Sequence, residues 1–143
     1  MKLAFHYHTP ATIRDGKVVI PAYLGLFIDS IAPHFIELIC ILHSPSNEQL
    51  EMMDYEVKAP NVKLRSLDSH SSIPKRYLKS RRTVELIKKV QEESDAVLVR
   101  ASTPLVPFFK RHWKKPIALM LVSDATLGLE NLPQPGWRKK LIM

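Results

Sequence analysis

The chain has 143 residues, of which 45% are hydrophobic and 24% are charged, a composition that suits one globular domain with one apolar core. The formal net charge of +7 predicts attraction to an anionic partner, while the single cysteine excludes a disulfide framework and favours a reducing, cytosolic setting. The four glycines form neither a Gly-x-Gly-x-x-Gly fingerprint nor a P-loop, which disfavours NAD enzymes and ATPases that depend on those motifs. No apolar run reaches the roughly twenty residues that a bilayer requires and no signal peptide is visible, so we expect a soluble cytoplasmic protein.

The first predicted element is a buried strand over residues 2–8, because this short apolar run is rich in Leu, Phe and Tyr and is followed by turn residues. Residues 9–20 are expected to form a loop beyond the end of this strand. A helix is predicted over residues 21–32, with Pro21 in its first turn and Pro33 at its end. The apolar residues that repeat at helical spacing in it are Leu24, Phe27, Ile28 and Ile31.

Two more strands and a short helix are predicted in the next part of the chain. Residues 36–43 form a second apolar run of the same type as the first. Residues 44–47 are turn residues that also cap a short predicted helix over residues 48–55. Residues 61–67 alternate between apolar and polar side chains, which is typical of a strand near the edge of a sheet.

The second half of the sequence continues the alternation of helices and strands. The longest predicted helix covers about residues 74–94, and an apolar strand follows over residues 95–100. A short apolar helix then runs through Phe109, and a further strand is predicted over residues 117–122. Residues 136–143 are expected to begin another helix.

Strands that alternate with helices predict an α/β fold, a Rossmann-like, doubly wound and mostly parallel sheet with helices on both faces. In the order 3-2-1-4-5, strand order reverses between the first and fourth strands, and ligands of such sheets bind beyond the carboxyl ends of the strands at that point. We therefore expect residues 8–16 and 100–104 to line one site, with Asp124 nearby. The candidate acceptor- or phosphate-binding residues are Arg14, Asp15, Gly16, Arg100, Ser102, Thr103 and Asp124.

Each candidate has a structural alternative. For Gly16 a turn is the favoured interpretation, whereas for Arg100 a structural ion pair and a functional role are equally suited. Ser102 and Thr103 are expected to cap a helix rather than to bind a ligand.

Two histidines two residues apart in the first strand, His6 and His8, are predicted to share a face. No third ligand has suitable spacing, so the sequence predicts packing in the core or cleft and no metal site.

Two thirds of the 21 basic residues cluster, with seven in residues 75–89, four in 110–115 and three in 138–140. A solvated face is the simplest interpretation. The sharper hypothesis is docking to anionic lipid headgroups at the inner membrane face, each cation contributing about 1 kcal/mol. Lys75, Arg76, Lys79 and Arg82 are the candidate membrane-surface residues. Nucleic-acid binding is not expected, because the basic stretches lack an interleaved aromatic platform and a recognisable motif.

Four segments together resemble the N-terminal, acceptor-binding domain of a GT-B fold glycosyltransferase, most closely the retaining family 4 enzymes. They are residues 2–8 leading into Asp15-Gly16, residues 21–29, residues 95–104 and residues 115–124. The resemblance implies a sugar or lipid-linked acceptor and a nucleotide-diphosphate-sugar donor. It also implies that the donor is bound by a missing C-terminal domain, so we expect this chain to bind no cofactor and to be inactive alone. Two positions depart from the family, which usually has adjacent glycines where Gly16 stands alone and often has histidine at the position of Arg100.

A second hypothesis is a stand-alone binding or regulatory module of flavodoxin-like topology, complete at its present length. Thr9-Pro10 follows the first strand where a phosphoacceptor receiver would have an acidic cluster, and residues 9–16 make a poor flavin phosphate loop. A fragment of a larger enzyme is instead expected to expose apolar residues near the C-terminus and to dimerise through them. Those residues are Trp137, Leu141 and Ile142.

Overall fold

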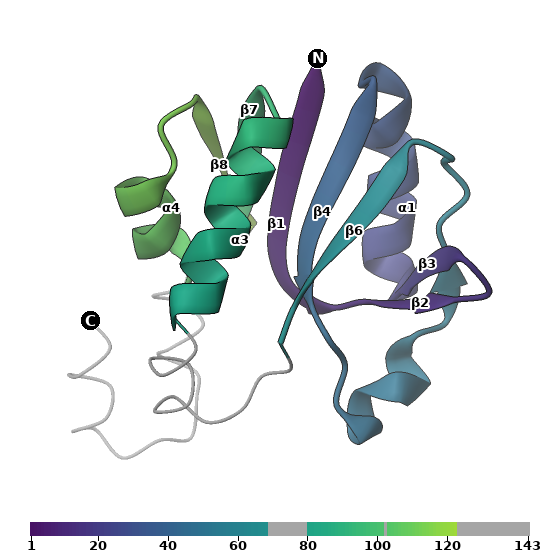
Figure 1. Ribbon diagram of the computed structural model, residues 1–143. Coiled ribbons are helices and arrows are strands. Elements are labelled where there is room, and N and C mark those ends of the chain that lie inside the picture. Colours follow the sequence, from purple (N-terminus) through teal and green to yellow (C-terminus); the bar gives the residue numbers. More distant parts are fainter. Residues whose placement is uncertain (69–79, 102, 123–143) are drawn as a thin grey trace.

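Figure 1 shows a computed structural model of the chain. The structure describes residues 1–68, 80–101 and 103–122. Five parallel strands form the central sheet, in the order β6-β4-β1-β7-β8. Their bounds are β1 Lys2–Pro10, β4 Glu37–His43, β6 Val62–Leu67, β7 Ala96–Ala101 and β8 Ile117–Leu121. This sheet confirms the predicted Rossmann-like α/β fold and its strand order 3-2-1-4-5.

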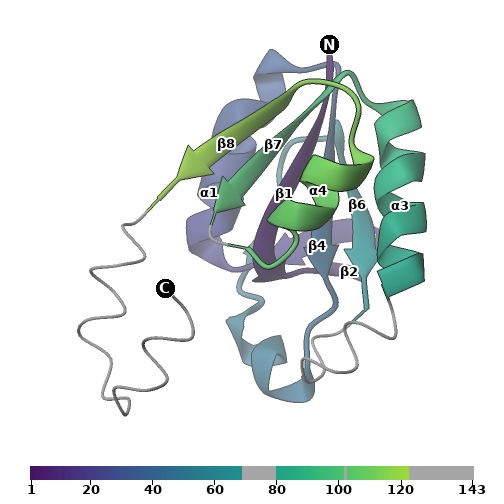
Figure 2. The same cartoon turned by 90° about the vertical axis from the view of Figure 1, so that its left-hand side faces the viewer.

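Helices cover both faces of the sheet, as expected of a doubly wound fold (Figures 1 and 2). Helix α1 (Ala22–Ile31) lies on one face, and helices α3 (Ser80–Glu93) and α4 (Val106–His112) pack together on the other. This division follows from right-handed crossovers, because the chain moves toward one edge of the sheet from β1 to β6 and toward the other edge from β6 through β7 to β8. In the described parts of the chain, no helix has both the length and the apolar character needed to cross a membrane.

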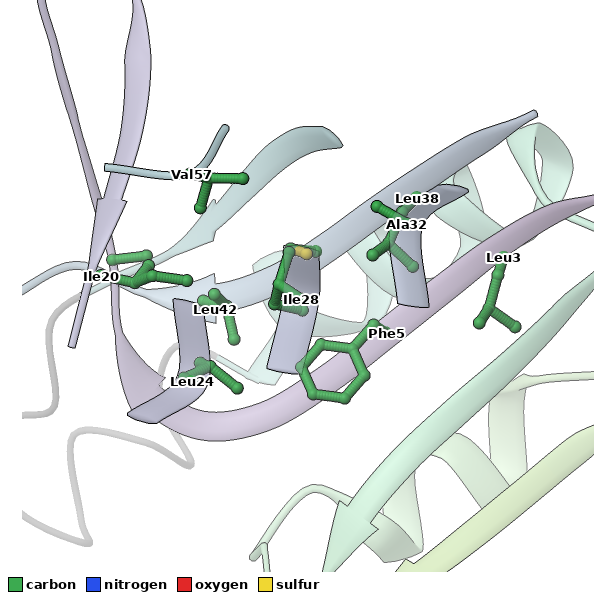
Figure 3. Close-up of a cluster of buried hydrophobic side chains, with 11 residues drawn as sticks. Leu3, Phe5, Ile20, Leu24, Ile28, Ala32, Leu38, Leu42 and Val57 are labelled. Atoms are coloured by element: carbon green, nitrogen blue, oxygen red, sulfur yellow. The ribbon is translucent and has the colours of Figure 1, made fainter. Parts of the chain in front are cut away.

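The central strand β1 contributes to two separate apolar cores, because successive side chains of a strand point to opposite faces. Phe5 belongs to the first core and packs with Leu24 and Ile28 of α1 (Figure 3). Ala4 belongs to the second core, which includes Phe109 of α4. β1 is therefore the element that both layers of helices share.

The expectation of a loop over residues 9–20 was wrong. β1 continues to Pro10, and the following residues form a hairpin of β2 (Thr12–Arg14) and β3 (Lys17–Ile20). The turn between them consists of Asp15 and Gly16, both with positive φ, at 51° and 77°. An Asp-Gly pair with this geometry is the type I′ turn that matches the twist of two short strands.

The expectation of a helix over residues 48–55 was wrong in type and length. A 3₁₀ helix, η2 (Asn47–Met52), replaces the first part, and Ser46 and Gln49 form a capping box at its start. The last part becomes strand β5 (Tyr55–Glu56), which pairs with β3 and completes a small sheet in the order β2-β3-β5. Pairing with the hairpin therefore outweighs the local helical pattern. A further 3₁₀ turn, η1 (Ala32–His34), extends α1 through Pro33.

Asp29 in α1 joins this small sheet to the main layer. Its carboxylate accepts a hydrogen bond from the Tyr55 hydroxyl at 2.7 Å and from the backbone N–H groups of Lys58 and Ala59 at 3.0 and 2.9 Å. Burial by itself raises the pKa of Asp29, but the hydrogen bonds from Tyr55, Ala59 and Lys58 outweigh burial and hold its pKa below the ordinary value.

Replacing Asp29 with alanine should lower the free energy of unfolding by about 2 kcal/mol at pH 7, because three donors lose a charged acceptor. Since the folded-state pKa is lowered, this stabilisation is present above the unfolded-state pKa and is lost as pH falls through the folded-state value. Urea unfolding of wild type and D29A at pH 7 and pH 3 measures both effects. E51A, at an exposed position of η2, is the control. Equal stability of D29A and E51A at pH 7 would contradict the conclusion that the Asp29 carboxylate stabilises the contact between α1 and the small sheet.

Gly25 leaves room for the Tyr55 ring against α1. A Cβ atom built on Gly25 would lie 2.1 Å from Cδ1 of Tyr55. Alanine favours a helix interior over glycine by up to about 1 kcal/mol, but overpacking against a hydrogen-bonded ring costs about 1–3 kcal/mol. We therefore expect net destabilisation of G25A in thermal unfolding. In a Y55A background the same substitution should become neutral or stabilising, and an unchanged cost there would exclude the ring as the cause.

Candidate functional site

The carboxyl ends of β1 and β7 lie side by side in the sheet, at the point where strand order reverses. On the face covered by α1, Arg100 of β7 contacts the rings of Tyr7 and Phe27, and the next residues on the same faces of β1 and α1, Thr9 and Tyr23, are hydrogen-bonded to each other. We call this group the Arg100 cluster, and its members are Tyr7, Thr9, Tyr23, Phe27 and Arg100. The structure therefore confirms the predicted reversal point and supplies aromatic residues that were not among the sequence candidates.

Arg100 is half-buried and lies against two aromatic rings. Its guanidinium carbon is 4.6 Å from the centroid of the Tyr7 ring and 5.6 Å from that of the Phe27 ring. Such contacts combine cation–π attraction with stacking of a planar group and hold the side chain in one orientation. The Arg100 Nε atom is buried and has no hydrogen-bond acceptor among the described residues.

Two hydroxyl groups complete the Arg100 cluster. The Thr9 and Tyr23 hydroxyls are hydrogen-bonded to each other at 3.2 Å. Thr9 is buried, whereas Tyr23 is 53% exposed, so the pair runs from the interior to the surface. Hydroxyls in this position can donate to or accept from a polar ligand. The cluster thus combines a fixed cation, aromatic surface and hydroxyl groups.

The opposite face of β1 holds His6, which is 1% exposed. His6 Nδ1 donates to the carbonyl oxygen of Ile41 at 2.7 Å, because a carbonyl can only accept. Nε2 is therefore unprotonated and accepts a hydrogen bond from the Thr103 hydroxyl at 2.8 Å, a tautomer assigned from these two partners. Burial lowers the pKa of His6 to about 4, the hydrogen bond to Ile41 opposes that effect, and the nearby His8 and His43 lower it further.

Thr103 connects the segment after β7 to the middle of β1 through its hydrogen bond to His6. Besides donating to His6, its hydroxyl accepts a hydrogen bond from the backbone N–H of Leu105 at 3.3 Å, just before α4 begins. This contact is a local turn, whereas the N-cap residue of α4 is Leu105 and no side chain caps the helix, so the predicted capping role of Thr103 is wrong. Thr103 is thus buried and doubly hydrogen-bonded on the face of the sheet opposite the Arg100 cluster.

A further pair of rings, His8 and His43, lies at the ends of β1 and β4, with centroids 5.4 Å apart. Across the described ranges, no three His, Cys, Asp or Glu side chains form a group that could hold a metal ion. His6 is engaged in the core through Ile41 and Thr103, as core packing predicts.

The hairpin carries Arg14, Asp15 and Gly16 away from Arg100. Figure 1 shows the hairpin beside β6, on the other side of β1 from β7. Gly16 there lines a surface hollow of about 250 Å³ together with Lys17, Val18 and residues 57–60 and 62. The expectation that residues 8–16 and 100–104 line one site is thus wrong for the turn residues, because the hairpin extends β1 sideways over the sheet edge.

Several sequence candidates lie outside the described residues. They are Ser102, Asp124, Lys75, Arg76 and Lys79, together with Trp137, Leu141 and Ile142 near the C-terminus.

Other basic residues lie on the outer surface of α3 and α4. Arg82 has a side chain that is 79% exposed and lies 3.7 Å from the Asp68 carboxylate. The pKa of His112 is lowered by partial desolvation and by the positive charges of Arg111, Lys88 and Lys114. These three cations therefore share one electropositive surface.

Sequence reasoning missed the aromatic members of the Arg100 cluster. Tyr7 and Thr9 are two residues apart in a strand, and Tyr23 and Phe27 are four apart in a helix, so each pair shares a face. Those spacings were a usable signal, but they also fit ordinary core packing. Chemically, the assembled cluster is suited to binding an anionic or polar ligand rather than to covalent chemistry. No family model, curated protein or solved structure was found to match this chain.

Proposed function

We propose that this chain is the acceptor-binding part of a nucleotide-sugar-dependent glycosyltransferase that transfers a sugar to a glycan or a lipid-linked acceptor. The observation that carries the proposal is the Arg100 cluster at the point where strand order reverses. In open α/β sheets, that crevice beyond the carboxyl ends of the strands is where ligands bind. The four segments that resemble GT-B enzymes support the same assignment.

In the proposed enzyme, this chain binds and orients the acceptor, while a second domain holds the nucleotide-diphosphate-sugar donor. Correct orientation of two reactants accounts for a large part of catalysis in a two-substrate transfer. The Arg100 guanidinium, the Tyr23 ring and the hydroxyls of the cluster are the groups that would contact the acceptor. Arg14, Asp15 and Gly16 have no part in this site, because the hairpin takes them to the β6 edge.

We also propose that the outer surface of α3 and α4 docks on an anionic membrane. Support comes from the exposed cations of this surface, each of which contributes about 1 kcal/mol near anionic lipid headgroups. Cosedimentation with phosphatidylglycerol vesicles and with phosphatidylcholine vesicles tests this part. Binding to the first kind that falls with added salt is expected, and equal binding to both kinds would contradict it.

An NMR titration of the 143-residue chain tests the acceptor site. Oligosaccharides and sugar phosphates should shift backbone amide signals of Tyr7, Tyr23 and Arg100, whereas riboflavin, a flavin without a phosphate group, should not. Incubation with nucleotide sugars should yield no sugar transfer by this chain alone. Flavin binding at the same amides would support the flavodoxin-like alternative and overturn the proposal, as would sugar transfer by the chain itself.

A further inference from the structure

Among the described residues, Arg100 differs from the other half-buried arginine of the sheet in having no ion-pair partner. Arg65 in β6 is paired with Glu93 of α3 at 2.9 Å. Throughout residues 1–68, 80–101 and 103–122, no carboxylate lies within ion-pair distance of Arg100. An arginine removed in part from water without a partner is costly, and structural cations are normally paired for that reason.

The guanidinium of Arg100 is held in place before any ligand binds. Tyr7 and Phe27 contact it, and the Phe27 ring lies in turn against Phe5, with centroids 5.6 Å apart. A guanidinium that is stacked on rings keeps its N–H groups in its own plane, where they can form two parallel hydrogen bonds to one oxyanion. Because the side chain is already ordered, binding loses less conformational entropy than it would with a free surface arginine.

The neighbours of Arg100 are also suited to an anion. The cluster contains hydroxyl groups and aromatic rings and includes no acidic side chain. Arg100 stands near the carboxyl end of β7, directly beside the reversal of strand order. The lack of a carboxylate partner among the described residues, a fixed guanidinium and this position in the sheet all point to the same place in the fold.

We infer that the ligand of the Arg100 cluster carries an oxyanion, a phosphate or a carboxylate, that pairs with the Arg100 guanidinium. This inference rests on the proposed function only in naming that ligand an acceptor. The acceptor class is then an acidic or phosphorylated sugar or lipid headgroup rather than a neutral glycan. Arg100 determines the preference for an anionic acceptor, and Tyr7 and Phe27 position the Arg100 guanidinium.

Titrations with glucose 1-phosphate, glucuronate, inorganic phosphate and glucose separate the possible ligands. We expect glucose 1-phosphate or glucuronate to shift the amide signals of Tyr7, Thr9 and Arg100, and glucose to leave them unchanged. A stronger response to one of the two charged sugars identifies phosphate or carboxylate as the group recognised. R100Q should weaken binding at least about tenfold, and R100K should weaken it less, because lysine keeps the charge but loses the bidentate geometry.

R14Q is the matched control, because Arg14 carries the same charge in the hairpin beside the other edge of the sheet. R100K keeps the test informative if R100Q does not fold. Thermal unfolding of each variant is measured alongside binding. Equal binding of charged sugars by R100Q and wild type would overturn the inference. So would inorganic phosphate shifts confined to α3 and α4, since those indicate adventitious ion binding.

The proposed function and this inference can fail separately. If neutral glycans bind at the cluster and R100Q leaves their affinity unchanged, the acceptor site stands and the anion inference is wrong. If simple carboxylates and phosphates bind through Arg100 but no sugar improves on them, the anion site stands and the glycosyltransferase proposal loses its support.

Discussion

Replacement of His6 by alanine is expected to lower the free energy of unfolding by about 3–4 kcal/mol at pH 7. The substitution removes a buried ring that packs against Phe109, with centroids 5.3 Å apart. It also leaves the carbonyl of Ile41 and the hydroxyl of Thr103 without the partner that each has in the native protein. Urea denaturation followed by circular dichroism measures the change. H34A, at an exposed position, should have little effect.

The same histidine should make the protein less stable in mild acid. Its pKa is about 4 in the folded state, against 6.5 when unperturbed, so the unfolded chain binds more protons between these values. The contribution of His6 is therefore complete above pH 6.5 and falls by about 3 kcal/mol as pH drops to 4. H6A should lack this part of the pH dependence, whereas H34A should retain it. An H6A profile parallel to that of wild type would show that other groups cause the loss.

Replacement of Phe109 by alanine should cost about 3–5 kcal/mol, the range found when a large buried aromatic side chain is truncated. Phe109 is 1% exposed and packs between His6 of β1 and Trp113, with centroids 5.3 and 6.1 Å away. Its loss would leave a cavity beneath α4 that rigid strands cannot fill by small shifts. Thermal and urea unfolding of the variant measure this cost.

F108A is a matched control, because Phe108 is the adjacent residue of α4 and has the same side chain but is only partly buried. We expect F108A to cost clearly less than F109A. Similar losses for the two variants would indicate that α4 is stabilised by its overall apolar character rather than by the specific packing of Phe109 against β1.

The larger elements could be predicted because local patterns agree with the environment that each element finally occupies. The apolar runs at residues 2–8, 36–43 and 95–100 became β1, β4 and β7, and all three are central strands buried on both faces. The spacing of Leu24 and Ile28 likewise identified the face of α1 that packs on the sheet.

The small sheet could not be predicted in the same way. Its strand β5 has two residues, which is too short for any periodicity, and it forms because β3 offers a free edge. The start of α1 shows the same dependence on distant residues, since its Ala22 N–H is capped by the Asp54 carboxylate, 32 positions away, at 2.8 Å. Such contacts between distant segments leave no repeat in the sequence.

By itself, the sequence determined the alternation of strands and helices, because burial repeats with a period of two in strands and about 3.6 in helices. The strand order and its reversal point then followed from the usual topology of doubly wound sheets. Only the tertiary structure decided which side chains meet at that point. It placed Arg100 against Tyr7 and Phe27, linked His6 to Thr103, and took Gly16 to the opposite edge. The physical reason is that periodicity fixes the face to which a side chain points, whereas its partners depend on the packing of elements far apart in the chain.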